Sequence, residues 1–222
     1  MFGLDFSMVD WQEVYTATMD TLRMLFASSL FAVLIGLPIG VMLYMCARST
    51  SVWIRACYTV LSFVVNILRS VPFIILIVAL IPVTRAIVGQ SYGVLGTIPP
   101  LVIGAAPFFA RLVETALNEV DKGVIEAAHA MGSSTRQVVW RVLLPEARPG
   151  LVAAITITVV TLVSYTAMSG LVGGGGLGDL AIKYGYNRYE TEVMIVAVVL
   201  MVVLVQLLQM AGDRVVRHFT RK

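Results

Sequence analysis

Side chains that commonly support catalysis or metal binding are few and far apart in this sequence. The two histidines, His129 and His218, lie on different segments, and no cysteine or carboxylate pair completes a metal-binding set around them. The glycine run at 173–178 could cradle a phosphate, but Asp179 follows it where a P-loop has Lys and Ser or Thr. Ser, His and Asp nowhere meet at one depth of the apolar segments, as a membrane hydrolase requires. We therefore expect no enzyme activity, no nucleotide site, no metal and no other cofactor.

A polar segment between two long apolar runs contains the residue types that cap short helices. Asp121 can cap the start of a helix that Gly132 ends, because glycine readily adopts the left-handed conformation just past a helix. Ser134 and Gln137 form a capping box that opens a second short helix, which Pro145 is expected to stop. The pattern predicts helix, glycine turn and helix outside the membrane. By itself it fits an ordinary amphipathic surface loop equally well.

Arg69 lies in the middle of an apolar run. A charge at membrane depth is costly unless it faces the interior of a bundle, so Arg69 is a candidate functional residue. The alternative is a structural arginine that hydrogen-bonds the carbonyls freed by Pro72. Because Pro72 lacks a backbone donor and disfavours helix at Val71, we expect a kink or break there.

Four polar or soft side chains recur three and four residues apart in a later apolar run: Thr158, Thr161, Tyr165 and Met168. On a helix they form one stripe, and in lipid such a stripe belongs inside a bundle. Threonine hydroxyls that bond their own helix backbone are the alternative explanation. The register favours a face that lines a pathway.

The composition indicates an integral membrane protein. Of 222 residues, 59% are hydrophobic and 13% are charged, and the net charge of +3 is too small to imply a nucleic-acid partner. A membrane span needs about 20 apolar residues. We expect an all-α integral membrane protein with one transmembrane domain over 1–222, with five spans near 24–47, 57–81, 94–112, 150–172 and 193–212.

Local features refine these spans. Gly36 and Gly40 form a GxxxG pattern that permits close helix packing. Arg111 and Glu114 mark the exit of the third span, and the run at 173–178 is expected to be a flexible turn facing outside. Three prolines predict that the third span is a bent helix that lines a cavity: Pro99, Pro100 and Pro107.

Basic residues gather on one side of the five spans. Of the 16 Lys and Arg residues, eleven fall in segments on the side of the polar loop at 121–145, four fall on the other side, and Arg69 lies within the membrane. The positive-inside rule therefore places the loop and the C-terminus in the cytoplasm and the N-terminus outside.

The polar loop resembles the "EAA loop" of importer-type ABC transporter permeases, in which it is the coupling helix that docks on the ATP-binding subunit. The positions that carry this resemblance are Glu126, Ala127, Ala128, Gly132, Leu144 and Pro145. Within the family the chain is most similar to permeases for D- and L-methionine. That narrower resemblance rests on three segments: Arg69–Leu76, Tyr165–Gly178 and Ala211–Arg217.

The resemblance implies a membrane subunit of a binding-protein-dependent importer in the bacterial inner membrane. Its partners would be a second copy of the chain, two cytoplasmic ATP-binding cassette subunits that hydrolyse ATP, an extracytoplasmic substrate-binding protein and membrane lipid. It also implies that Met168 narrows the closed pathway, since a flexible thioether can seal an irregular gap. Glu126 would orient the coupling helix or form a salt bridge to the ATPase.

Two other functions compete with methionine import. The first is an ATP-independent channel or secondary carrier, which the five-span count, the loop and the lack of an intramembrane carboxylate pair disfavour. The second is an ABC permease for another amino acid or small polar solute. Only the cargo separates this second function from methionine import, and the residues of the permease do not reveal it.

Overall fold

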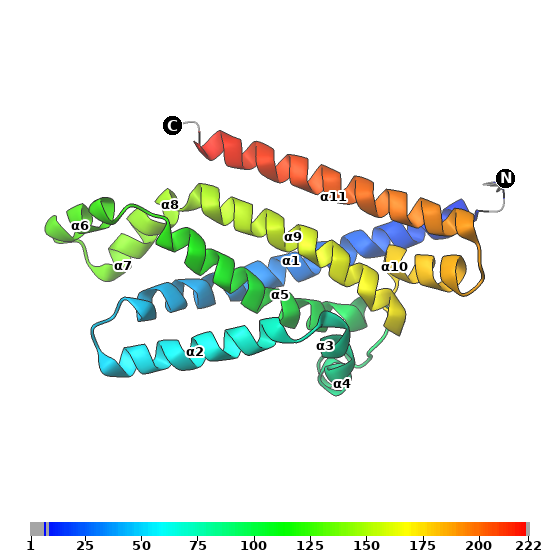
Figure 1. Ribbon diagram of the computed structural model, residues 1–222, viewed down its shortest axis with the longest axis horizontal. Coiled ribbons are helices and arrows are strands. Elements are labelled where there is room, and N and C mark those ends of the chain that lie inside the picture. Colours follow the sequence, from blue (N-terminus) through cyan, green and yellow to red (C-terminus); the bar gives the residue numbers. More distant parts are fainter. Residues whose placement is uncertain (1–6, 8, 221–222) are drawn as a thin grey trace.

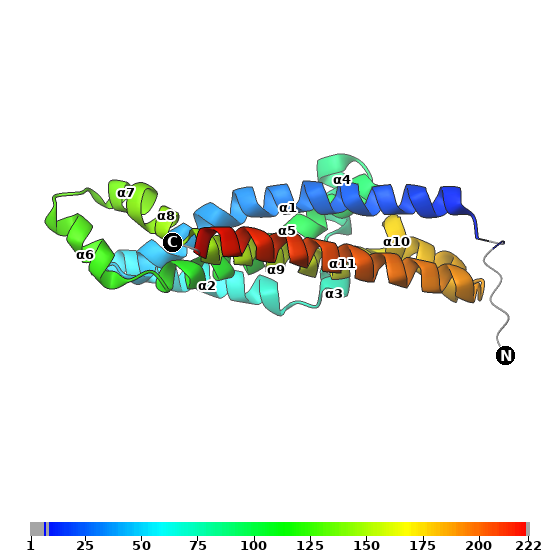
Figure 2. The same cartoon turned by 90° about the horizontal axis from the view of Figure 1, so that it is seen from above.

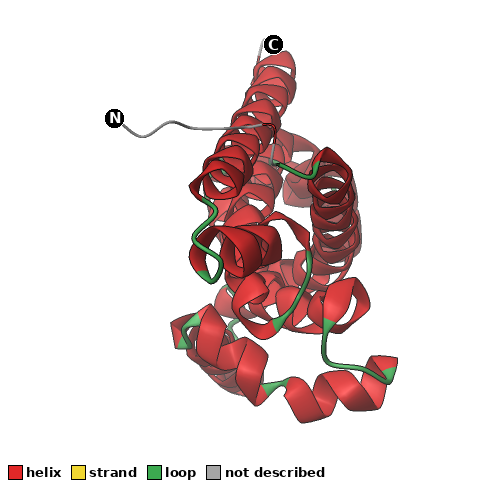
Figure 3. Cartoon of the chain, turned by 90° about the vertical axis from the view of Figure 1, so that its right-hand side faces the viewer, coloured by secondary structure: helices red, strands yellow, loops and turns green. Residues whose placement is uncertain are grey.

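The computed structural model describes residue 7 and residues 9–220, and within them it holds helices and loops but no strand (Figure 3). Five helices are long and apolar enough to cross a membrane: α1 (Trp11–Ala47), α2 (Val52–Ser70), α5 (Gly93–Asn118), α9 (Arg148–Ser169) and α11 (Thr191–Thr220). They run along one elongated bundle (Figure 1 and Figure 2). The expected all-α fold with five spans is confirmed. The ends of the domain expected over 1–222 lie outside the described residues.

Short helices lie at both ends of the bundle and beside its middle. The polar loop contains α6 (Lys122–Ala130), α7 (Thr135–Val138), the π-helical turn η2 (Val139–Leu143) and α8 (Leu144–Glu146). The opposite end contains the 3₁₀ turn η3 (Gly170–Val172), α10 (Gly176–Leu180) and the π-helical turn η4 (Ala181–Tyr186). Between α2 and α5 lie α3 (Phe73–Ala79) and α4 (Ile81–Val88). The start of α1 and the end of α11 are at opposite ends of the bundle (Figure 1).

Helix α5 occupies the centre and packs along α1 and α9. The GxxxG pattern of α1 faces it. A Cβ added to Gly36 would lie 2.7 Å from the backbone oxygen of Ala106, and one added to Gly40 would lie 2.5 Å from that of Ala110. The two glycines therefore let the backbones of α1 and α5 approach closely, as their spacing predicts.

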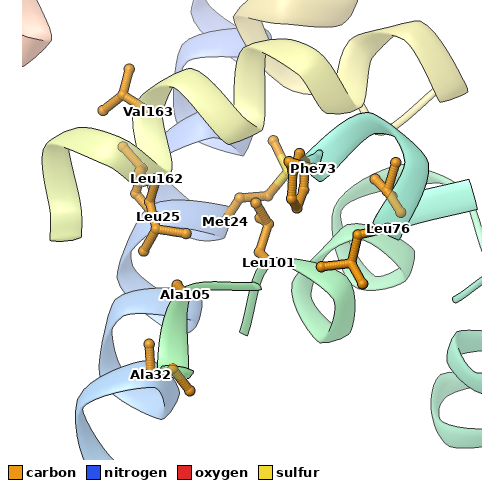
Figure 4. Close-up of a cluster of buried hydrophobic side chains, with 11 residues drawn as sticks. Met24, Leu25, Ala32, Phe73, Leu76, Leu101, Ala105, Leu162 and Val163 are labelled. Carbon is orange, nitrogen blue, oxygen red and sulfur yellow. The ribbon is translucent and has the colours of Figure 1, made fainter. Parts of the chain in front are cut away.

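Apolar side chains from four helices fill the middle of the bundle (Figure 4). Met24 of α1, Phe73 of α3, Leu101 of α5 and Leu162 of α9 belong to this cluster and are buried. The cluster attaches α3 to the long helices, although α2 ends just before it.

Helices α2 and α11 leave most of their apolar surface uncovered within this chain. Only 6% of the apolar window of α2 and 11% of that of α11 are buried, compared with 61% for α5. Phe63 on α2 and Val202 on α11 are among the exposed side chains. Lipid or another polypeptide must cover these faces in a membrane.

The bounds of the first two spans differ from the expected ones. Helix α1 begins at Trp11 rather than near residue 24, because Asp10 caps it by accepting hydrogen bonds from the backbone N–H groups of Gln12 and Glu13. Helix α2 ends at Ser70, so the span expected to reach residue 81 is divided between α2 and α3. The break predicted at Pro72 is confirmed.

The third span is one continuous helix, α5, from Gly93 to Asn118, with all three prolines inside it. The three proline rings remove backbone hydrogen bonds, but α5 is buried between α1 and α9, and this packing holds it helical. Arg111 and Glu114 accordingly lie inside the helix rather than at its exit.

The glycine run at 173–178 forms a turn that approaches neighbouring segments closely at several of its positions. A Cβ on Gly170 would lie 2.4 Å from the carbonyl carbon of Gly178. The backbone N–H of Leu177 donates to the hydroxyl of Thr21 on α1, at 2.8 Å. The missing side chains here serve close backbone approach, which a glycine-rich composition alone does not distinguish from flexibility.

Candidate functional site

The first helix of the polar loop begins where the sequence predicts. The carboxylate of Asp121 accepts a hydrogen bond from the backbone N–H of Gly123 at 2.6 Å, which caps α6. Gly123 and the residues around it are exposed. The start of α6 is thus held by a local contact of its own sequence.

A glycine turn ends α6 in a defined geometry. The N–H of Gly132 donates to the carbonyl of His129 at 2.9 Å, and the N–H of Ser133 donates to that of Ala128 at 3.2 Å. These two bonds form a Schellman motif, and Gly132 has the left-handed φ of 80° that this motif requires. The predicted helix end at Gly132 is confirmed.

The capping box that opens α7 is also present. The N–H of Ser134 donates to Oε1 of Gln137 at 2.8 Å, and the N–H of Gln137 donates to Oγ of Ser134 at 3.4 Å. The prediction that Pro145 stops this second helix is wrong, because helical backbone continues to Glu146. The π-helical turn η2 precedes Pro145, and its wider hydrogen-bond spacing accommodates the missing proline donor.

The loop positions that resemble the EAA pattern divide into anchoring and exposed residues. Ala128 is buried at 3% exposure, and Leu144 packs against the apolar cluster at this end of the bundle. Glu126 and Ala127 are exposed, as is Met131, the residue before the glycine turn, at 80%. The loop therefore presents one acidic and several apolar side chains away from the bundle, while its other positions fix it in place.

Glu126 forms no salt bridge within the described part of the chain. It lines a shallow cavity of about 280 Å³ together with Arg48, Lys122 and Ile125. A larger cavity of about 610 Å³ lies between the loop and the α1–α2 junction. Two basic side chains, Arg48 and Lys122, thus share this cavity with the Glu126 carboxylate.

A hydrogen-bonded ion pair that the sequence analysis missed joins α2 to α5. Arg111 forms a salt bridge with Glu114, which is only 5% exposed. The Arg111 guanidinium also donates to the side chains of Ser62 and Asn66, each at 2.9 Å. The hydroxyl of Tyr58 donates to Oε1 of Glu114 at 3.2 Å. Opposite charges three residues apart within an apolar helix are the signal that could have revealed it.

Two of the predicted pathway residues, Arg69 and Tyr165, lie together at one small cavity of about 200 Å³. Arg69 is exposed and donates no hydrogen bond within the described residues, so the alternative of a structural arginine bonded to free carbonyls is not observed. Its guanidinium carbon lies 5.7 Å from the ring centroid of Phe108. Tyr165 stacks on Phe73 with ring centroids 4.3 Å apart and planes within 2°.

The other members of the predicted stripe do not line this cavity. Thr158 is buried, and its hydroxyl donates to the carbonyl of Ala154 at 2.8 Å. Thr161 donates to the carbonyl of Ile157 at the same distance. The threonines thus bond their own helix backbone, as in the alternative explanation. Met168 is 43% exposed.

At the opposite end of the bundle, η4 is tied to α1. The hydroxyl of Tyr184 donates to Oε1 of Glu13 at 2.6 Å, and this bond raises the pKa of Tyr184. Burial raises the pKa of the Asp179 carboxyl, Lys183 partly opposes that rise, and the Glu13 carboxylate adds to it. Within the described residues there is no group of three His, Cys, Asp or Glu side chains that could hold a metal ion.

Residues 36–222 match the sequence profile of the family of binding-protein-dependent transport system inner membrane components.

The chain belongs to this family.

Relatives within the family cover almost the same length. The probable D-methionine transport system permease protein MetI of Vibrio cholerae is 50% identical over 203 residues, which are 91% of this chain and 90% of that protein. The D-methionine transport system permease protein MetI of Escherichia coli K12 is 54% identical over 203 residues, which are 91% and 94%. The fold agrees with a chain of the MetNI methionine ABC transporter in an inward-facing conformation, with a TM-score of 0.91, 51% identity and coverage of 98% and 100%.

Proposed function

We propose that this chain is the transmembrane subunit of an ATP-driven, binding-protein-dependent importer of D- and L-methionine. The observation that carries the proposal is its 50% and 54% identity, over 91% of its length, to relatives named as methionine permeases. The permease fold shared with the methionine transporter at a TM-score of 0.91 supports it. The chain forms the pathway, and a separate subunit hydrolyses ATP.

The polar loop is the surface that docks on the ATP-binding subunits. Its exposed Glu126, Ala127 and Met131 project from a helix whose two ends are fixed by an Asp121 cap and the Gly132 turn. Two capped helices joined by a defined turn move as a unit, so closure of the ATPases can displace the ends of α5 and α9, to which the loop is connected. The movement of the ATPases on ATP binding is thereby transmitted to the membrane helices.

A second copy of the chain completes the pathway, because five spanning helices are too few to enclose one. The uncovered faces of α2 and α11 supply surface for that copy and for lipid. ATP and the loaded binding protein each favour one of two packings of the same helices, which yields inward-facing and outward-facing states. The loop and the C-terminus face the cytoplasm, and the N-terminus faces the extracytoplasmic binding protein.

Four side chains are assigned to the pathway: Arg69, Thr161, Tyr165 and Met168. Tyr165 and Arg69 share a cavity, and Met168 lies exposed on the same helix as Tyr165. In this proposal Met168 narrows the closed pathway and swings aside when it opens.

The test begins with purification of the tagged chain from gently solubilised membranes. Partners that copurify are identified by mass spectrometry, and the complex is assayed for ATP hydrolysis. It is then reconstituted into proteoliposomes with the copurified or cognate binding protein, and uptake of radiolabelled L- and D-methionine is measured. Copurification of an ATP-binding subunit and ATP-dependent methionine uptake are expected. Uptake without ATP would favour a carrier, and uptake of a different solute would overturn the methionine assignment.

A further inference from the structure

Two arginines lie at the interface of α2 with α5, and their surroundings differ. The guanidinium of Arg111 is paired with Glu114 and hydrogen-bonded to Ser62 and Asn66. Arg69 has no hydrogen bond and no ion pair within the described residues, and its only ring contact is with Phe108. Arg69 is exposed to the cavity beside it, and an unpaired charge within a membrane span is costly, so this guanidinium is available to pair with an anion there.

The helices around Arg69 do not provide that anion. Helices α2, α5 and α9 together contain one carboxylate, Glu114, and Arg111 already pairs with it. A second copy related by a two-fold axis along the membrane normal presents the same groups at the same depths. It therefore brings another paired Glu114 and no free carboxylate from these helices. A bound molecule is therefore the candidate source of an anion for Arg69.

The cavity beside Arg69, here called the Arg69 pocket, has the size and walls for a small amphipathic molecule. Its volume of about 200 Å³ is below the roughly 300–1,000 Å³ of pockets for drug-sized ligands. Phe73 and Tyr165, whose rings stack on each other, both line it. Gly104 also forms part of its wall, where an added Cβ would come within 3.3 Å of the Leu76 side chain and reduce the space.

We propose that the Arg69 pocket binds the α-carboxylate of the transported amino acid within the membrane, with the cargo's side chain against Phe73 and Tyr165. A guanidinium holds a carboxylate through two parallel, charge-assisted hydrogen bonds. Aromatic rings provide a favourable contact for a thioether or another apolar side chain. The permease itself then selects for a free carboxylate. This inference rests on the proposed function, because it names the cargo contact of that pathway.

The test is a binding cycle that pairs a change in the protein with a change in the ligand. The complex of this chain with its ATPase subunits, without the binding protein, is placed in nanodiscs. Binding of radiolabelled L-methionine and of L-methioninamide, which lacks the carboxylate, is measured by equilibrium dialysis, and binding to the ATPase subunits alone is subtracted. The variants are Arg69→Met, Arg69→Lys and, as a matched control outside the pocket, Arg85→Met.

We expect Arg69→Met to weaken methionine binding by about ten- to hundredfold, as for the loss of a hydrogen-bonded charge partner. Arg69→Lys should retain part of the affinity, and Arg85→Met all of it. Methioninamide should bind the wild-type complex weakly and be insensitive to Arg69→Met. The proposal is overturned if Arg69→Met leaves methionine binding unchanged, or if it weakens methionine and methioninamide equally. Thermal unfolding of each complex identifies variants that fail to fold. If Arg69→Met fails to fold, methionine and methioninamide binding to Arg69→Lys tests the proposal instead.

Failure of the Arg69 pocket proposal is distinguishable from failure of the proposed function. A wild-type complex that imports another amino acid contradicts the methionine assignment, and the same cycle is then run with that amino acid and its amide. A wild-type complex that imports methionine while Arg69→Met binds it normally contradicts only the role of the Arg69 pocket.

Discussion

The Cα of Gly40 faces the backbone oxygen of Ala110 so closely that a Cβ on Gly40 would lie 2.5 Å from it. One turn earlier, Gly36 has the same relationship with Ala106, at 2.7 Å. No rotamer change can relieve a contact with a backbone atom. The crossing of α1 and α5 is therefore fixed at its present separation by the absence of two side chains.

Gly40→Ala should destabilise the chain by about 1–3 kcal/mol, because overpacking at this crossing forces the two backbones apart. Thermal unfolding of the purified chain in detergent measures the effect. The matched control is Gly104→Ala in α5, where the added Cβ would meet only side-chain atoms, at 3.3 Å and beyond. That substitution should be neutral or slightly stabilising, since alanine favours helix over glycine. An equal loss of stability in Gly40→Ala and Gly104→Ala would contradict the explanation that close approach of the α1 and α5 backbones causes the effect.

Gly132→Leu should uncouple ATP hydrolysis from uptake. Leucine is strained by about 1–2 kcal/mol in the left-handed conformation that Gly132 adopts, so the turn between α6 and α7 will rearrange. We expect the ratio of transported solute to hydrolysed ATP to fall in proteoliposomes.

The matched control for this turn is Gly89→Leu. Gly89 also has a φ of 80° and, like Gly132, nothing within 4 Å of an added Cβ, but it ends α4. Equal strain there should leave the ratio of uptake to hydrolysis unchanged. Gly132→Asn should retain most coupling, because asparagine tolerates this conformation. Normal coupling in Gly132→Leu would show that the turn has no coupling role.

Glu114→Leu should lower the free energy of unfolding by about 3–5 kcal/mol, because it leaves the Arg111 guanidinium without its buried partner. Replacing both residues, as Arg111→Met with Glu114→Leu, should recover most of this loss, since an apolar pair of similar volume is often as stable as a buried ion pair. A double-mutant cycle on the unfolding of the purified chain measures the coupling. Additive effects of the two single substitutions would mean that the pair contributes no specific interaction.

Asp179→Asn should raise the melting temperature at pH 7. Burial raises the pKa of this carboxyl in the folded chain, so the ionised form is disfavoured there relative to the unfolded chain. The stability that the protonated Asp179 carboxyl contributes is present below its unfolded pKa of about 3.9, and it is lost as pH rises through the higher folded pKa. The difference between variant and wild type should therefore shrink as pH approaches about 4. Lys183→Met should enlarge this difference in melting temperature, because Lys183 opposes the rise in the pKa of Asp179. A difference in melting temperature that is independent of pH would exclude titration of Asp179 as the cause.

Sequence reasoning succeeded where a feature depends on neighbouring residues. The Asp121 cap, the Gly132 turn and the Ser134 capping box each form from contacts within a few residues, so their spacing predicts them. The break at Pro72 is equally local, because one ring removes one donor and restricts the preceding residue.

Features that depend on distant contacts were missed or mistaken. The run at 173–178 is held against α1 because Leu177 bonds Thr21, which is 156 positions away. Helix α5 remains continuous through its prolines because α1 and α9 surround it, which nothing near Pro107 reveals. The side chains that share the Arg69 pocket come from four separate helices and the α2–α3 junction. No spacing along the chain indicates that they meet.

Helix α1 has a mechanical consequence that follows from its length. Its 37 residues extend about 55 Å, whereas the apolar core of a bilayer is about 30 Å thick, so a long arm projects beyond the membrane. The contacts of Gly36 and Gly40 with α5 act as a fulcrum far from the N-terminal end of the helix, to which η4 is bonded through Tyr184 and Glu13. A tilt of about 10° about that point moves Trp11 by about 6–7 Å, given the helical rise per residue. Small rotations near the polar loop are thereby converted into large displacements on the opposite side of the membrane.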